Sequence, residues 1–157
     1  MRSPQTTGLR SCPIRDSGHG SEGNQMVIFG LRGMKTNIGD PHRNMVDFAH
    51  IPVVKRLTRM PVCIDPSHSV GTRSRSADDI LDIMHVTAQG VIAGANMILV
   101  DFHPEPNVAL VDGPQAMRME ELPVFLEDVL IVREAYEKRL SRVTGSAAGY
   151  LAKSIVG

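Results

Sequence analysis

Polar side chains that could do chemistry follow three apolar segments of the chain. Asp65 and His68 lie in "DPSH" after the second segment, and Asp101 and His103 lie in "DFHPEP" at the end of the third. Asp112 follows a short loop later in "VDGPQ". An imidazole with two carboxylates is a suitable donor set for a borderline divalent cation such as manganese, iron, cobalt or zinc. The residue types therefore predict a metal site if these segment ends meet.

Basic side chains follow the first apolar segment, where Arg32 and Lys35 lie in "LRGMKTN". A guanidinium offers a fixed fork of donors for a phosphate or a carboxylate. Each feature taken alone has a structural explanation, since a histidine at a strand end is often a loop residue and Asp-Pro and Asp-Gly pairs open turns. Polar groups follow all three apolar segments, and purely structural roles at all three would require three independent coincidences. We therefore interpret these polar groups together as one site.

The three apolar segments have the pattern of β-strands, and we expect strands at 26–31, 61–65 and 96–102. Each segment is short, dense in β-forming residues and bounded by turn residues. This pattern is typical of parallel strands that are buried on both faces.

Helical patterns lie between and after these strands. The first, "RNMVDFAHIPVVKRLT", is expected to be interrupted at Pro52, and the second, "SADDILDIMHVTAQGVIAGA", has Ser76 as its expected N-cap with Asp79 three residues on. The third, "MEELPVFLEDVLIVREAYEKRL", has apolar residues at helical spacing. The alternation of strands and helices predicts an α/β fold with right-handed crossovers, in which the loops at the carboxyl ends of the strands converge.

Composition limits the partners and the compartment. The 157 residues include 17 Lys plus Arg and 17 Asp plus Glu, so no net field attracts a polyanion such as nucleic acid. The basic residues Lys55, Arg56 and Arg59, at the end of the first predicted helix, are expected on a solvated face that complements the helix dipole. The sequence has no apolar run long enough for a secretory signal or a membrane span, so we expect a cytoplasmic chain. Cys12 and Cys63 have neither disulfide nor zinc spacing and are expected to be reduced thiols.

Two long stretches resemble one enzyme family. "LRGMKTNIGDPHRNMVDFAHIPVVKRLTRMPVCIDPSHSVGTR" and "ILVDFHPEPNVALVDGPQAM" resemble the carboxyl-terminal part of 3-deoxy-7-phosphoheptulonate synthase, an enzyme of the shikimate route to aromatic amino acids. The order of Asp-Pro-Ser-His, His-Pro-Glu-Pro and Asp-Gly-Pro-Gln is what makes the resemblance specific. The related 3-deoxy-octulosonate 8-phosphate synthase shares much of the site. The stretch of Lys35, Thr36, Arg43 and Asn44 looks more like the heptulosonate enzyme.

The resemblance implies a (β/α)8 barrel that condenses phosphoenolpyruvate with erythrose 4-phosphate, a transferase reaction that needs a divalent metal such as Mn, Fe, Co or Zn. It implies that Arg32 contacts the phosphoenolpyruvate phosphate and that Asp65 contacts the aldose. It also implies that His68 and Asp112 ligate the metal, with Asp101 where the family has a ligating glutamate. We expect catalytic roles for Arg32, Asp65 and His68. The expected substrate-binding residues are Arg32, Lys35, Thr36, Arg43, Asp65 and Ser67.

The resemblance covers only part of a barrel, which takes about 250 residues. We expect a mobile polar tail at 1–24, the last three βα units of a barrel at 25–145, and a carboxyl-terminal tail at 146–157. A fourth metal ligand, a cysteine, and a Lys-Pro-Arg-Thr loop for the aldose phosphate belong to the other strands. Self-association or another chain would then supply those strands. The alternatives are a non-catalytic remnant or partner subunit, and an octulosonate synthase.

Overall fold

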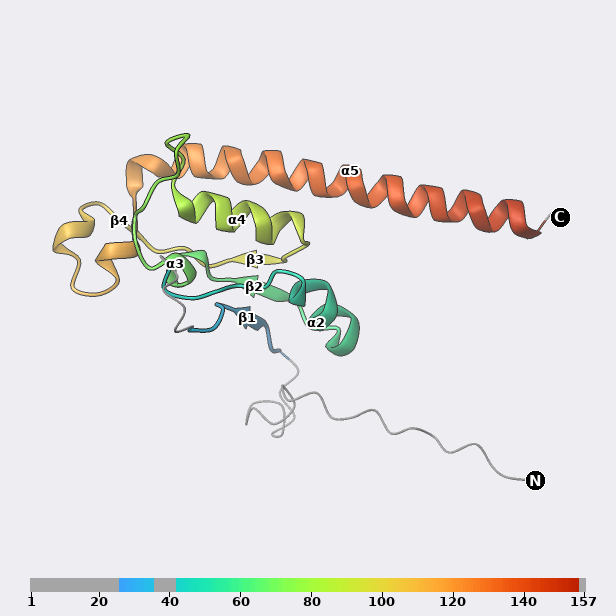
Figure 1. The fold of residues 1–157 in the computed structure, drawn as a ribbon, viewed down its shortest axis with the longest axis horizontal. Coiled ribbons are helices and arrows are strands. Elements are labelled where there is room, and N and C mark those ends of the chain that lie inside the picture. Colours follow the sequence, from blue (N-terminus) through green and yellow to red (C-terminus); the bar gives the residue numbers. More distant parts are fainter. Residues whose placement is uncertain (1–25, 36–41, 156–157) are drawn as a thin grey trace, which may run out of the picture.

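A computed structural model describes residues 26–35 and 42–155 of the chain. Three parallel strands form a sheet in the order β1, β2, β3, and two further parallel strands, β4 and β5, pair beside it (Figure 1). The strands are β1 (Phe29–Leu31), β2 (Val62–Ile64), β3 (Met97–Ile98), β4 (Phe102–His103) and β5 (Met117–Arg118). The α-helices are α2 (His50–Thr58), α3 (Pro66–Val70), α4 (Asp82–Ile92) and α5 (Leu122–Ile155). The predicted α/β fold with parallel strands is confirmed.

Helices α2 and α4 pack against the same face of the sheet. Val62 and Ile64 of β2 are buried there against Ile51 and Val54 of α2. Helix α4 comes so close to β2 that a Cβ on Gly90 would lie 2.4 Å from the Ile64 side chain. The sheet face that carries Ile64 therefore packs against both helices and forms the hydrophobic core of the sheet.

The opposite face of the sheet is open, so the prediction that the strands are buried on both faces is wrong. Gly30, Cys63 and Met97 are neighbours in the strand register and share this face. Gly30 is exposed, Cys63 is half-buried and Met97 is 48% exposed. Among the described residues, the packing helices all lie on the other side of the sheet, which leaves this apolar face without a cover.

The third predicted strand, 96–102, divides into β3 and β4. The Leu99 N–H still donates to the Ile64 carbonyl of β2. Beyond Leu99 the backbone takes new partners: Asp101 donates its N–H to Ser67 Oγ, and its carbonyl accepts from the N–H of Met117. The chain therefore turns away from the sheet at the residue whose carboxylate is a candidate ligand. Strand β5, which pairs with β4, was not expected from the sequence.

Two expected helix boundaries are wrong. Pro52 does not interrupt α2 but lies in its first turn, where backbone N–H groups have no partner within the helix and a proline is tolerated. Ser76 is not a helix cap, because α4 begins at Asp82 after Leu81. The Ser76 hydroxyl instead hydrogen-bonds the Ile80 carbonyl and the Asp78 side chain in the preceding turn, and the His85 side chain of α4.

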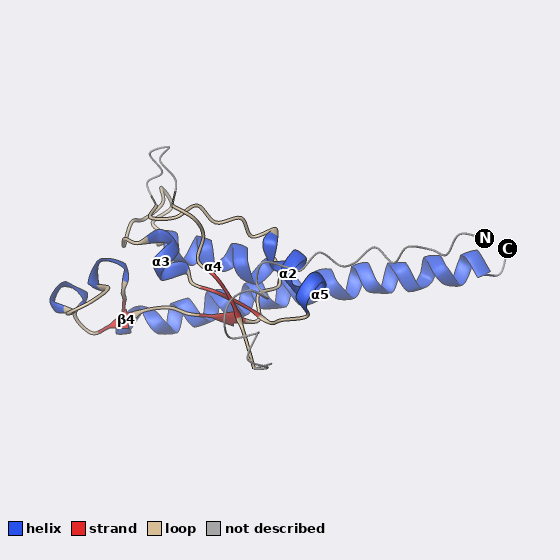
Figure 2. Cartoon of the chain, turned by 90° about the horizontal axis from the view of Figure 1, so that it is seen from below, coloured by secondary structure: helices blue, strands red, loops and turns tan. Residues whose placement is uncertain are grey.

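The expected third helix is confirmed as α5, which continues past the sheet as one helix and passes the expected domain end at 145 (Figures 1 and 2). Phe125 buries its side chain in a cluster with Val86 of α4 and Met117 of β5. No helix in the described part of the chain is both long and apolar enough to cross a membrane. The predicted tail at 1–24 lies outside the described residues.

Candidate metal centre

The turn after β2 carries the first part of the site. Asp65 caps the short helix α3, since its side chain accepts a hydrogen bond from the backbone N–H of His68 at 3.2 Å. Gly71 ends this helix at φ +75, and a Cβ there would lie 2.7 Å from the Cβ of Arg43. The helix is thus fixed at both ends, and the direction of His68 is fixed with it.

Asp65 also orients the imidazole of His68. Asp65 Oδ1 lies 2.9 Å from His68 Nδ1, while Oδ2 accepts from Arg32 Nε at 3.0 Å. Asp65 is 5% exposed, so its carboxylate is buried between the two partners. A carboxylate that holds one ring nitrogen leaves the other nitrogen for a ligand, as in many histidine metal sites. In this arrangement His68 Nε2 is the nitrogen that faces Asp112.

Asp101 approaches the histidine from the segment between β3 and β4. Its Oδ2 lies 3.8 Å from His68 Nδ1. Its backbone is anchored by Ser67, which has no exposed surface and accepts the Asp101 N–H at 2.9 Å. Ser67 was predicted to bind substrate, and in this structure its hydroxyl ties α3 to Asp101.

Asp112 completes the cluster from a strained turn. Its φ is +57, in the left-handed region. The next residue, Gly113, packs against Pro106, so that a Cβ on Gly113 would lie 2.3 Å from the Pro106 carbonyl oxygen. Aspartate tolerates this region better than most residues. Asp112 Oδ1 consequently lies 3.5 Å from His68 Nε2.

Ligand atoms from His68, Asp101 and Asp112 all lie within 4.8 Å of one another. A nitrogen and two carboxylate oxygens at this spacing suit manganese, iron, cobalt or zinc. His68 is 17% exposed at its side chain, Asp101 27% and Asp112 43%, so the cluster is open to solvent on the Asp112 side. The structure therefore brings together the three residues that the sequence predicted as ligands, and their chemistry fits a divalent cation.

The fourth ligand that the family resemblance implied has no counterpart in the described part of the chain. Cys63 lies two residues before Asp65 but outside the cluster of ligand atoms. Burial, and secondarily the Asp65 carboxylate, raises the pKa of the Cys63 thiol above its ordinary value. That direction favours the protonated thiol, whereas a metal ligand is a thiolate.

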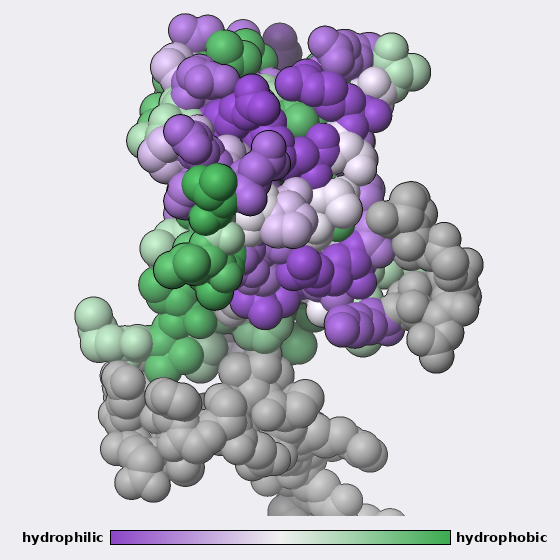
Figure 3. All heavy atoms as spheres, turned by 90° about the vertical axis from the view of Figure 1, so that its left-hand side faces the viewer, coloured by the Kyte–Doolittle hydropathy of each residue, from purple (hydrophilic) through white to green (hydrophobic). Residues whose placement is uncertain are grey.

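The predicted substrate-binding residues lie at varying distances from the cluster. Arg32 is joined to it through Asp65 and keeps 56% of its side chain exposed. Lys35 and Arg43 are exposed, and the Arg43 N–H pairs with the Val70 carbonyl at the end of α3. Thr36 lies outside the described residues. Seen from the carboxyl ends of the strands, this side of the molecule is mostly hydrophilic, with one apolar strip (Figure 3).

Two buried polar residues at the site were not predicted to have a role there. Asn44 is 8% exposed and donates to the His68 carbonyl at 2.9 Å. Gln115 is 1% exposed and donates to both Asp101 and Asp112. Asn44 follows Arg43 directly and Gln115 lies in the same motif as Asp112, which is the signal that the sequence offers for a role at the site. A motif alone does not show which of its side chains is buried.

Comparison with known proteins gives a consistent result. The sequence model of the DAHP synthetase I family matches residues 9–138. Phospho-2-dehydro-3-deoxyheptonate aldolase of Thermotoga maritima is 29% identical over 115 residues, which are 73% of this chain and 32% of that protein. 2-Dehydro-3-deoxyphosphooctonate aldolase of Syntrophobacter fumaroxidans is 31% identical over 135 residues, or 78% of this chain and 45% of that protein.

Solved structures agree with the sequence relatives. The crystal structure of the Thermotoga maritima heptonate aldolase (DAHP synthase) superposes with a TM-score of 0.58 at 31% identity, covering 80% of this chain and 32% of that one. The chain thus spans less than half the length of each of these relatives. Because the family match covers most of the sequence and the same motifs supply the clustered acids and histidine, the chain belongs to the DAHP synthetase I family.

Proposed function

We propose that this chain forms the last three βα units of a barrel that condenses phosphoenolpyruvate with erythrose 4-phosphate and releases phosphate. The observation that carries the proposal is the convergence of His68, Asp101 and Asp112 beside the Arg32–Asp65 pair at the carboxyl ends of parallel strands. Active sites of barrels of this kind form at that end, from loops that follow different strands. Family membership supports the same reaction class.

Each residue has a distinct part in the proposed reaction. His68, Asp101 and Asp112 would hold a divalent ion, which supplies a Lewis acid for the aldehyde of the aldose. Arg32 binds the phosphate of phosphoenolpyruvate through the part of its guanidinium that Asp65 does not engage. Asp65 fixes the Arg32 Nε and the His68 ring at the same time, so that the phosphate and the aldehyde are bound in a constant relation. Lys35, Thr36, Arg43 and Ser67 complete the proposed substrate-binding residues.

The relatives of this chain include both heptonate and octonate aldolases, and the two kinds of enzyme differ in the aldose that they use. The sequence stretch with Lys35, Thr36, Arg43 and Asn44 favours erythrose 4-phosphate. The alternative is an octulosonate synthase, which would take a five-carbon aldose phosphate in its place. The second alternative is a non-catalytic remnant or partner subunit.

The proposed reaction also needs the strands that this sequence does not contain. The open face of the sheet carries Cys63 and Met97, and Leu99, the residue after β3, is 50% exposed. Burial of such apolar surface is the main source of association free energy. We propose that the rest of a barrel, or another copy of the chain, covers this face. Light scattering of the purified chain should then show association, and a stable compact monomer would contradict this part of the proposal.

The experiment that tests the function supplies the missing strands in trans. The chain is mixed with the amino-terminal half of a complete heptulosonate synthase, and phosphoenolpyruvate consumption is followed with manganese and either erythrose 4-phosphate or a five-carbon aldose phosphate. We expect turnover of erythrose 4-phosphate in the mixture and turnover near background for the chain alone, since several donors and one metal ligand are then absent.

The matched control separates the site from general effects on charge. Arg32→Ala should lower turnover about a hundredfold or more, as expected for loss of a preorganised donor. Arg56→Ala, which removes an exposed arginine from α2, should leave turnover unchanged. Faster turnover of the five-carbon aldose would favour the octulosonate alternative. Robust turnover by the 157-residue chain alone would contradict the need for further strands.

A further inference from the structure

We propose that Gln115 is a positioning residue that sets the separation of Asp101 and Asp112 for a shared divalent cation. The inference rests on the metal centre of the proposed function and is independent of the substrates. Gln115 would not itself ligate the ion. Its side-chain amide would act through the two carboxylates.

The amide of Gln115 bridges the two acids. Its Nε2 lies 3.0 Å from Asp101 Oδ2 and 2.9 Å from Asp112 Oδ1. An amide nitrogen carries two hydrogens, so each carboxylate receives one. Ionised carboxylates only accept, which requires that the nitrogen of the amide, and not its oxygen, faces them. The orientation of the side chain is therefore determined by its partners.

This bridge has an electrostatic consequence. Two carboxylates that approach the same histidine repel each other when no cation lies between them. The donors of Gln115 stabilise both charges and hold one oxygen of each acid at a fixed distance. The remaining lone pairs of Asp101 and Asp112 stay available for a cation. Groups that hold ligands in this way commonly contribute 10- to 100-fold to metal affinity.

The backbone that follows Gln115 is held by two contacts. The neighbouring Ala116 carbonyl accepts from Arg73 at 2.9 Å, and Arg73 also binds both oxygens of Glu121. The Met117 N–H donates to the carbonyl of Asp101 at 2.9 Å. Gln115 is thus fixed relative to Asp101 by a main-chain hydrogen bond as well as by its own side chain.

A second observation supports a role beyond packing. Gln115 is 1% exposed, and its Oε1 is buried without a hydrogen-bond partner in the described part of the chain. Leaving a buried acceptor unpaired costs free energy. An apolar side chain of similar shape would avoid this cost and fill the same space. The presence of an amide is explained by what its N–H groups do for Asp101 and Asp112.

The test measures metal binding by the full chain rather than activity. Gln115→Met keeps the approximate length and removes the donors, whereas Gln115→Asn keeps the amide but shortens its reach by one methylene. Mn²⁺ and Co²⁺ are titrated by calorimetry, and the visible absorption of bound Co²⁺ reports the coordination geometry. Thr87→Val is the control, because Thr87 is also fully buried but hydrogen-bonds only the Ile83 carbonyl within α4.

We expect Gln115→Met to raise the Kd for both ions 10- to 100-fold and to alter the Co²⁺ spectrum. Gln115→Asn should raise the Kd by a smaller factor, and it serves as the folded variant if the methionine variant does not fold. Thr87→Val should leave Kd and spectrum unchanged, whatever its stability. If the wild type binds the ions and both Gln115 variants show the same Kd and spectrum, the role of Gln115 is contradicted, while the metal centre itself stands. Absence of binding by the wild type would overturn the metal centre itself.

Discussion

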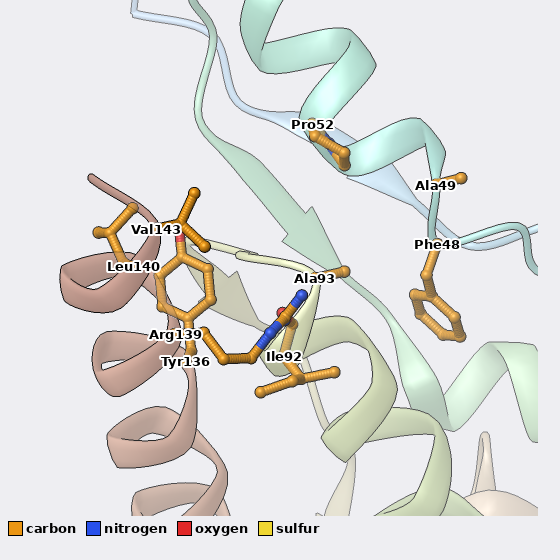
Figure 4. Close-up of a pocket in the computed structure, with 9 residues that line it drawn as sticks. All are labelled: Phe48, Ala49, Pro52, Ile92, Ala93, Tyr136, Arg139, Leu140 and Val143. Carbon is orange, nitrogen blue, oxygen red and sulfur yellow. The ribbon is translucent and has the colours of Figure 1, made fainter. Parts of the chain in front are cut away.

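The two ends of the sheet are built differently although the same strands and helices form both. At the carboxyl end, Asp65 is hydrogen-bonded to His68, and the Gln115 amide donates to both Asp101 and Asp112. At the amino end, α2, the α4–β3 turn and α5 enclose a hollow of about 540 Å³ (Figure 4). Its lining is mostly apolar and includes Phe48, Pro52, Ile92, Tyr136, Leu140 and Val143.

The cations at the two ends have different uses. At the amino end, Arg139 donates to the Ile92 carbonyl and Lys55 to the Gly94 carbonyl, so both stabilise the carboxyl terminus of α4. At the carboxyl end, Arg32 binds Asp65 and keeps more than half of its side chain exposed. This difference fits the proposed function, in which the carboxyl end holds the reacting groups and the amino end contributes stability, as is usual in barrels.

The largest effect that separates the two ends is expected from Gly113→Ala. The added Cβ would meet the backbone oxygen of Pro106, which cannot move aside as a side chain could. The turn that carries Asp112 must then shift, and we expect metal affinity to fall at least tenfold and stability to fall by about 3 kcal/mol. Calorimetry and urea unfolding measure the two effects.

The control for this variant is Gly145→Ala. Gly145 lies in α5, and beyond its own helix turn no atom of the described residues lies within 4 Å of where a Cβ would stand. Alanine is the better helix former, so stability should stay constant or rise by up to about 1 kcal/mol, with unchanged metal affinity. Equal losses in both variants would show that the tight turn at Gly113 is not what orients Asp112.

A smaller effect, limited to stability, is expected from Tyr136→Ala at the amino end. The Tyr136 ring lies against Gly94, where a Cβ would be 3.0 Å from its hydroxyl oxygen, and the Arg133 guanidinium lies 5.6 Å from the ring centroid. Loss of this half-buried ring should lower the free energy of unfolding by about 1–3 kcal/mol. Metal affinity should not change. A parallel loss of metal affinity would mean that the two ends are coupled.

The smallest effect concerns pH. Hydrogen bonds from Arg73, which binds both carboxylate oxygens, hold the pKa of Glu121 below its ordinary value near 4.5. The lowered pKa in the folded state contributes stability above about pH 4.5, and this stability is lost as the pH falls through the folded-state pKa.

Glu121→Gln removes this titration. Between about pH 6 and pH 3, the wild type should lose about 1 kcal/mol more than the variant, as measured by urea unfolding at each pH. Identical pH dependence in the two proteins would show that the Arg73–Glu121 contact contributes nothing to acid stability.

The sequence predicted the parts of the molecule that depend on local pattern. The α/β order, the central strand around Val62 and the helix that contains Phe125 follow from apolar periodicity. The cluster of His68, Asp101 and Asp112 was predicted because the motifs of His68 and Asp101 lie at the ends of apolar segments, and that of Asp112 follows after a short loop.

The parts that were missed depend on contacts distant in sequence. The division of 96–102 into β3 and β4 is caused by Ser67, whose hydroxyl accepts the Asp101 N–H although the two residues are 34 positions apart in the sequence. The open sheet face could not be predicted, because an apolar run does not reveal what covers it. The prediction of Ser76 as a helix N-cap was wrong because a serine side chain can hydrogen-bond the backbone of a turn as readily as that of a helix start.

The most direct test of the account is a Mn²⁺ and Co²⁺ titration of the full chain and of His68→Ala. His68 is the candidate nitrogen ligand and lies within 4 Å of both candidate acids. The account predicts one saturable site in the wild type and at least a hundredfold weaker binding in the variant. His50→Ala, which removes an exposed histidine from the start of α2, should bind as the wild type does. Equal heats in all three proteins would contradict the assignment of a metal centre to the carboxyl ends of these strands.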